Sequence, residues 1–144
     1  MIDLTAAASA LEAANQVVAA GIARLAEIGL DENQVLAYDV AHAAAAVQTG
    51  QSLLGYGIKG DVEASIANAF IADAIAELAG KVFGRESEWG VGYDALDSTR
   101  EYVATYRNPE FLAGLAGTAG PRHLSDDFEM VQDAFRRFAD EKLK

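Results

Sequence analysis

The sequence predicts an all-α protein, an up-and-down helical bundle of about four main helices. Alanine, which has the highest helix propensity, supplies 30 of the 144 residues. The β-branched residues that favour strands are sparse, and there are only two Pro. Apolar residues recur at the three- and four-residue steps of amphipathic helices. With 51% hydrophobic residues, the chain is about the size of one ordinary domain and can bury a core.

The first helix is predicted from Asp3 or Thr5 to Ile28, with Gly29 just past its end. Its apolar residues repeat every seven positions, and one more isoleucine shares their stripe. This narrow seam indicates a helix lying nearly parallel to a neighbour. The seam consists of Leu4, Leu11, Val18, Ile22 and Leu25.

A second helix is predicted after Asp31, which we expect to cap it, with Glu32 in its first turn. Gly50 falls on its apolar stripe and therefore predicts a point of close approach to another helix. The stretch at 55–57, Gly-Tyr-Gly, ends the element. The apolar stripe consists of Leu36, Val40, Ala43, Val47, Gly50 and Leu54.

A third helix is predicted from a cap at Asp61 to about Phe83. It carries two apolar stripes, which indicate packing on more than one side, in the middle of the bundle. One stripe has Ile66 and Phe70; the other has Ile71, Ile75, Leu78 and Val82.

The helical pattern breaks over 84–93, where three Gly occur. A fourth helix is predicted over 94–107. The Asn108–Pro109 pair then combines a cap with a Pro at the first helical position, opening a short helix over 110–116. Residues 117–123 (Gly-Thr-Ala-Gly-Pro-Arg-His) are predicted to be a linker. The predicted helical bundle domain therefore spans 1–116.

Ser125 is expected to cap a final helix that runs to Lys144 without Gly, Pro or a closing cap. The phenylalanines on its apolar face either close this bundle or belong to a second core outside the chain. The preceding linker and the uncapped end favour the second interpretation, so 124–144 is expected to begin a further domain or to dock on a partner. The apolar face consists of Phe128, Val131, Phe135 and Phe138.

Charge and composition exclude several classes of function. The net charge of −11 disfavours nucleic acid and anionic lipid as partners. The longest uncharged stretch, 40–58, contains polar residues, Gly and much Ala, which argues against a membrane span. The N-terminus has no signal-peptide pattern, so a cytoplasmic protein is expected. The absence of Cys excludes disulfides, thiol nucleophiles and thiolate metal ligands.

The sequence predicts no catalytic, cofactor-binding or metal-binding residue. A di-iron bundle needs Glu-x-x-His on two helices, whereas this chain has one Asp39-x-x-His42, and its other histidine, His123, lies in the linker. We interpret His42 as a partly buried structural imidazole. No nucleophile motif or phosphate-binding glycine loop occurs. Trp89 with Tyr93 either stacks on a ligand or plugs the core, and the core role is favoured.

The C-terminal residues 124–144, LSDDFEMVQDAFRRFADEKLK, resemble the opening helix of acyl-CoA dehydrogenases. Residues 33–93, with the Gly-Val-Gly-Tyr stretch at 90–93, are similar to the C-terminal four-helix domain of that family. That domain normally follows the catalytic region, but here its likeness comes first. This order resembles the N-terminal extension found in the methylsuccinyl-CoA dehydrogenase branch.

The resemblance implies an FAD-dependent acyl-CoA dehydrogenase, with methylsuccinyl-CoA as the substrate of that branch. In the family, a Glu removes the α-proton, FAD takes the β-hydride, and an electron-transfer flavoprotein accepts the electrons. These parts follow the opening helix, so the chain is expected to be a non-catalytic accessory domain without cofactor residues, joined to the remaining polypeptide in a homo-oligomer. The alternative is a free-standing interaction module whose C-terminal helix docks on a partner.

Overall fold

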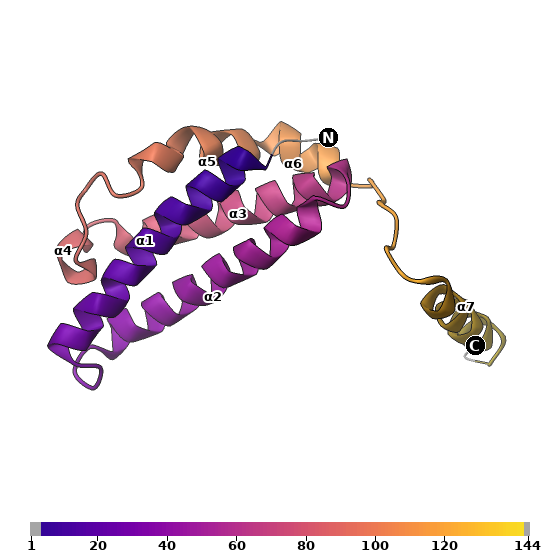
Figure 1. Cartoon of the computed structure of the whole chain (residues 1–144), viewed down its shortest axis with the longest axis horizontal. Helices are drawn as coiled ribbons and strands as arrows, with labels where there is room; N and C mark the ends of the chain where they lie inside the picture. Colours follow the sequence, from indigo (N-terminus) through magenta and orange to yellow (C-terminus); the bar gives the residue numbers. More distant parts are fainter. Residues whose placement is uncertain (1–3, 143–144) are drawn as a thin grey trace.

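The structure is a computed structural model that describes residues 4–142. The described chain is all-helical, without β-strands, which confirms the predicted class (Figure 1). The predicted alternative helix start at Asp3 and helix end at Lys144 lie outside the described residues. The elements are α1 (Thr5–Ile28), α2 (Gln34–Gly57), α3 (Asp61–Val82), α4 (Glu86–Trp89), the 3-10 turn η1 (Asp97–Thr99), α5 (Arg100–Tyr106), α6 (Pro109–Leu115) and α7 (Asp126–Lys142).

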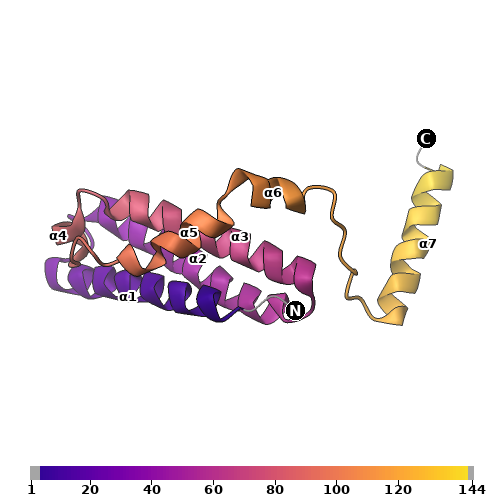
Figure 2. The same cartoon turned by 90° about the horizontal axis from the view of Figure 1, so that it is seen from above.

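The bundle is built on the three long helices α1, α2 and α3, which lie side by side in up-and-down order (Figures 1 and 2). Short connections at 29–33 and 58–60 force sequential helices to be antiparallel neighbours. The η1–α5 segment lies across α1 and α3, and α6 lies against α3. Helix α7 stands apart at the end of an extended segment (Figure 2).

The core lies between the three long helices, and Gly50 marks the predicted close approach. A Cβ at Gly50 would lie 2.8 Å from Leu11 Cδ1 on α1 and 3.3 Å from Ile71 Cγ1 on α3. All of the predicted α2 stripe is buried except Leu54, which is half-buried. The largest core side chains are Leu11, Leu36, Ile71, Ile75 and Trp89.

The buried face of α1 is centred on small residues rather than on the predicted seam. Leu11, Val18 and Leu25 are buried as predicted, but Ile22 is 53% exposed, so its assignment to the buried stripe is wrong. Burial shifts instead toward the side of the helix where small side chains let α2 and α4 approach closely. These small buried residues are Ala7, Ala10, Ala14 and Gly21.

Helix α3 packs against α1, α2 and α5, which confirms its central place. The stripe from Ile71 to Val82 is buried, but the second stripe is not, since Ile66 and Phe70 are exposed. Their places in the interior are taken by Ala64, Ala67, Asn68 and Ala72. Small side chains therefore form the second buried face, and the two large ones point outward.

Two predicted helix caps are wrong. Helix α2 begins at Gln34, with Asn33 rather than Asp31 at its N-cap. The Asn33 amide donates to the carbonyls of Ile28 and Gly29, so it bridges back to the end of α1. Asp61 is the first residue of α3, one position after the N-cap residue Gly60.

The predicted fourth helix is interrupted. Residues 94–96 form turns, and i to i+3 bonding continues through η1 before α5 begins. The Thr99 hydroxyl donates to the Leu96 carbonyl at 2.7 Å and reinforces this tighter turn. The Asn108–Pro109 start of α6 is confirmed, because Asn108 Oδ1 accepts from the Glu110 N–H at 2.8 Å.

Replacing Gly50 with Val should lower the free energy of unfolding by about 1–3 kcal/mol, because the added side chain would collide with Leu11 and Ile71, which pack against this glycine. Gly80, on α3, is the matched control, since a Cβ there would meet nothing within 4 Å. Gly80→Ala should raise the free energy of unfolding by about 0.5–1 kcal/mol. Urea denaturation measures both changes, and equal effects at the two glycines would contradict the close approach at Gly50.

Candidate functional site

The residues considered as metal ligands do not form a metal site. No group of three or more His, Asp or Glu among the described residues is placed to hold a metal ion. Asp39 faces α3 and the start of α4, where it is paired with cations. His42 is exposed and lies against the Tyr38 ring at 4.2 Å between centroids, so its interpretation as partly buried is wrong. The linker residue His123 lies elsewhere, beside Glu63.

Asp39 belongs to an ion-pair network that joins α2, α3 and α4. Its carboxylate lies 2.7 Å from Arg85 Nη1 and 3.3 Å from Lys81 Nζ. Arg85 also donates to both carboxylate oxygens of Glu88, at 2.7 and 3.0 Å. The hydrogen bonds from Arg85 hold the pKa values of Asp39 and Glu88 below their ordinary range. With every charge paired, this network ties the helices together.

Trp89 fills the core under the 84–93 loop, which confirms the favoured interpretation. It is 0% exposed and covers α1, where a Cβ on Gly21 would lie 3.0 Å from Trp89 Cε3. Its indole N–H is buried without a hydrogen-bond partner in the described structure. Tyr93 is 90% exposed, so the two rings do not form a ligand-stacking pair.

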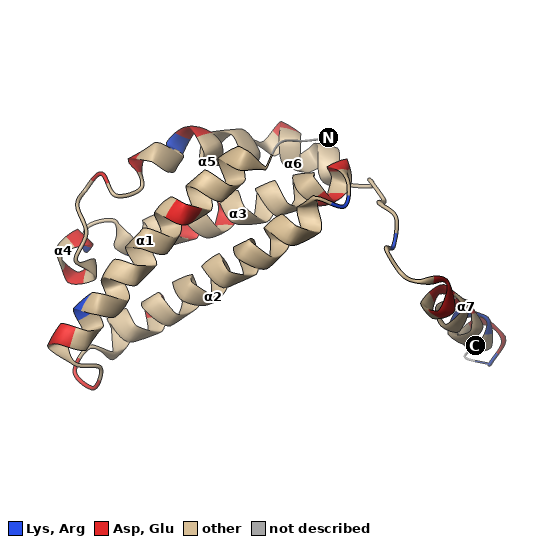
Figure 3. Ribbon diagram, viewed as in Figure 1, with Lys and Arg blue, Asp and Glu red and all other residues tan. Residues whose placement is uncertain are grey.

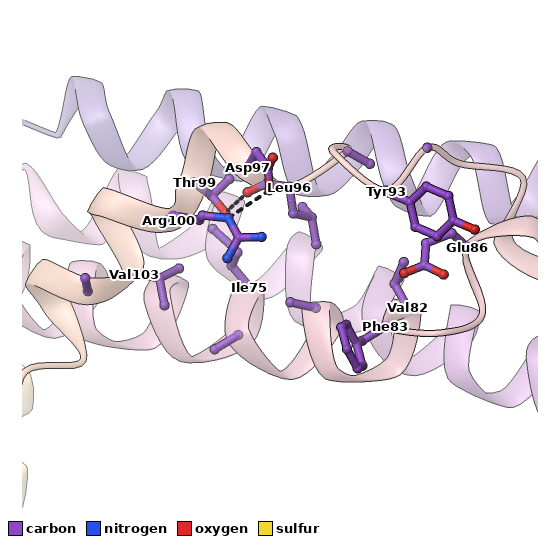
Figure 4. A pocket seen from close by; sticks show the side chains of 15 residues that line it. Ile75, Val82, Phe83, Glu86, Tyr93, Leu96, Asp97, Thr99, Arg100 and Val103 are labelled. Carbon is purple, nitrogen blue, oxygen red and sulfur yellow. Dashed lines mark hydrogen bonds and ion pairs between the residues drawn. The ribbon is translucent and has the colours of Figure 1, made fainter.

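A groove of about 460 Å³ runs between α3 and the segment from α4 to α5. Apolar side chains of α3 form its floor, with Phe83 and Tyr93 near one end (Figure 4). Arg100 lies toward the other end, where its Nε donates to Asp97 Oδ1 at 2.8 Å (Figure 4). This mainly apolar lining suits an apolar group. Other lining residues include Ile75, Val82, Leu96 and Val103.

Helix α7 presents the largest run of exposed apolar side chains in the described chain. None of its described residues is buried, and Phe135 is 71% exposed. Acidic and basic residues occur along α7, whereas α2 has almost no charged residues (Figure 3). Monomeric proteins rarely expose such a face unless it binds something. The exposed set is Phe128, Met130, Val131, Phe135 and Phe138.

Two buried polar contacts connect residues far apart in sequence and were not predicted. The Tyr102 hydroxyl on α5 donates to Asn68 Oδ1 on α3 at 2.9 Å, and burial raises the pKa of that phenol. The Glu63 carboxylate, 2% exposed, lies 2.6 Å from His123 Nε2. The only available sequence signal was the presence of polar residues on an apolar helix face, which does not identify their partners.

In comparisons with known proteins, no family model, curated protein or solved structure matches the chain. The resemblance to acyl-CoA dehydrogenases therefore stays a prediction. None of the described helices has the length and apolar character needed to cross a membrane.

The lowered pKa of Asp39 predicts a pH-dependent stability. The contribution of this carboxylate is fully present above its ordinary pKa of 3.8 and is lost as the pH falls through the lowered value. Asp39→Asn should cost about 1 kcal/mol of unfolding free energy at neutral pH. Urea unfolding at pH 7 and pH 3 measures this cost, which should shrink at the lower pH. A cost equal at both pH values would contradict an ionised, paired Asp39.

The exposure of α7 predicts that Phe135→Ala changes the unfolding free energy of the bundle by no more than about 0.5 kcal/mol. Trp89→Ala is the buried aromatic control and should cost about 3–5 kcal/mol. Thermal unfolding followed by circular dichroism compares the two variants. A loss at Phe135 as large as that at Trp89 would mean that α7 closes this bundle.

Proposed function

We propose that this chain is the non-catalytic N-terminal helical domain of an FAD-dependent acyl-CoA dehydrogenase that oxidises the α,β-bond of an acyl-CoA thioester. Methylsuccinyl-CoA, oxidised to mesaconyl-CoA, is the substrate we propose. The observation that carries the proposal is the segment 124–144, whose sequence resembles the opening helix of that family. Within this segment, Asp126–Lys142 form the helix α7, which lies outside the bundle with its phenylalanine face exposed.

The physical support is that nothing in the described structure covers the apolar face of α7. Phe128, Phe135 and Phe138 are each more than half exposed, although phenylalanines at helical spacing normally lie in a core. Covering each of them would contribute about 1.5–3 kcal/mol. A second core, supplied by the remaining polypeptide, would provide that cover.

The charge distribution on α2 also supports a domain that packs against protein. Asp39 is the one Asp, Glu, Lys or Arg residue in Gln34–Gly57, and it is directed toward α3 and α4. The outer face of α2 is therefore uncharged in a chain of net charge −11 (Figure 3). Interface cores are depleted of charged residues in the same way. This face is the one we assign to contacts in the homo-oligomer.

The chemistry of the proposed enzyme belongs to the rest of its polypeptide. FAD would accept the hydride there, a Glu would remove the α-proton, and an electron-transfer flavoprotein would accept the electrons. The bundle would position α7 at the start of the next domain and contribute surface to the assembly. The ion pairs of Asp39 and the hydrogen bond between Tyr102 and Asn68 are used within the bundle.

The second candidate function is a free-standing interaction module. The exposed face of α7 repeats apolar residues at three- and four-residue steps, the pattern of a helix that binds in a groove. In this case deletion of 124–144 would abolish partner binding and leave the bundle folded. The two candidates differ in whether the groove belongs to the same polypeptide.

The deciding experiment measures the mass of the native polypeptide in an extract of the source organism. The first proposal predicts a product several times heavier than 15.2 kDa that carries flavin absorbance and oxidises methylsuccinyl-CoA with an electron acceptor. A native product of 15.2 kDa, or a heavy product without flavin and without acyl-CoA oxidation, would overturn it.

A further inference from the structure

Glu63 is the one buried Asp or Glu among the described residues, and its partner lies outside the three long helices. It occupies the first turn of α3 and is 2% exposed. A buried carboxylate is costly unless it is paired and hydrogen-bonded. The partner is His123, 60 residues later in the chain, at 2.6 Å between Nε2 and Oε1. The hydrogen bond from His123 lowers the pKa of Glu63, in keeping with an ionised acceptor.

Residues 120–123, the segment that contains His123, pack closely against the bundle. A Cβ on Gly120 would lie 2.6 Å from Glu63 Oε1 and 3.5 Å from Val62 Cβ, so a larger residue here would force this carboxylate to move. His123 has a φ of 53°, in the left-handed region that side chains rarely adopt unless their surroundings hold them there. Its ring also meets Tyr56, at the end of α2, edge to face with centroids 6.0 Å apart.

Arg122, the residue before His123, contacts α7 instead of the bundle. The Arg122 guanidinium donates to Gln132 Oε1, and its Nη1 lies 4.0 Å from Asp133 Oδ1. Consecutive side chains of the connecting segment therefore hold the bundle on one side and α7 on the other. Neither contact uses Phe128 or Phe135, which stay exposed.

We propose that residues 120–123 are a bracket that fixes the position of α7 relative to the bundle, through Glu63–His123 on one side and Arg122–Gln132 on the other. A free Gly- and Ala-containing linker of this length would let α7 sample many orientations. The bracket instead presents the phenylalanine face of α7 in one orientation. This inference does not depend on whether α7 binds the same polypeptide or a separate partner.

The absence of Cys allows the test to be made in the whole chain. Gln48→Cys on α2 and Asp140→Cys on α7, both at exposed positions, carry spin labels, and electron–electron double resonance measures the distance between them. The parent protein should give one narrow distribution. Adding His123→Ala should broaden it about twofold, because the connecting segment then behaves as a flexible chain. Arg122→Ala should also broaden the distribution, because α7 then loses its contact with residues 120–123.

His42→Ala is the matched control, since His42 is an exposed histidine that contacts Tyr38 and not the connecting segment. It should leave the distribution narrow. His123→Ala removes the partner of the buried Glu63 carboxylate and should lower the melting temperature. Because His123 lies outside the bundle helices, the variant should still keep the helix content of the parent in circular dichroism, which separates loss of the bracket from unfolding. A broad distribution in the parent, an unchanged one in His123→Ala, or equal broadening in His42→Ala would each overturn the proposal.

Discussion

The close approach of α1, α2 and α3 through small side chains is the constraint on which the rest of the fold depends. Gly50 lets Leu11 of α1 and Ile71 of α3 both pack closely against α2, and Gly21 lets Trp89 lie against α1. Interiors packed at crystal-like density tolerate little added volume at such points. Because the helices come close enough to share these contacts, one tryptophan is sufficient to fill the space beneath the irregular 84–93 segment.

Buried polar contacts fix the position of one helix along another, which small apolar residues alone do not do. Alanine-lined helices can slide past each other with little change in buried area, since one alanine resembles the next. Asn68 on α3 donates to the Ala64 carbonyl and accepts from the Tyr102 hydroxyl, so α5 is held at one position along α3. The Asp39 network does the same for α4. An amide or carboxylate displaced from its partner would lose its hydrogen bonds, and this penalty selects a single arrangement.

Helix periodicity predicted most of the fold because it depends on local sequence. The stripe through Leu36, Val40 and Val47, and the close approach at Gly50, follow from spacing alone. The errors at Ile22 and Phe70 have one cause: the hydrophobic pattern gave weight to large side chains, whereas the buried faces are centred on Ala and Gly. The bracket could not be predicted, because Glu63 and His123 are 60 residues apart and no pattern relates them.

Helix α7 has the local features needed to stay helical before it meets a partner. At 17 residues, α7 is only slightly longer than the isolated helices of up to about 12–15 residues that are marginal in water. Three acidic residues in its first turn and Lys142 in its last turn oppose the partial charges of the helix ends. A helix already formed, and held by Arg122 at one side, loses less conformational entropy on docking than a disordered segment would. More of the free energy from covering Phe128, Phe135 and Phe138 is then available to stabilise the complex.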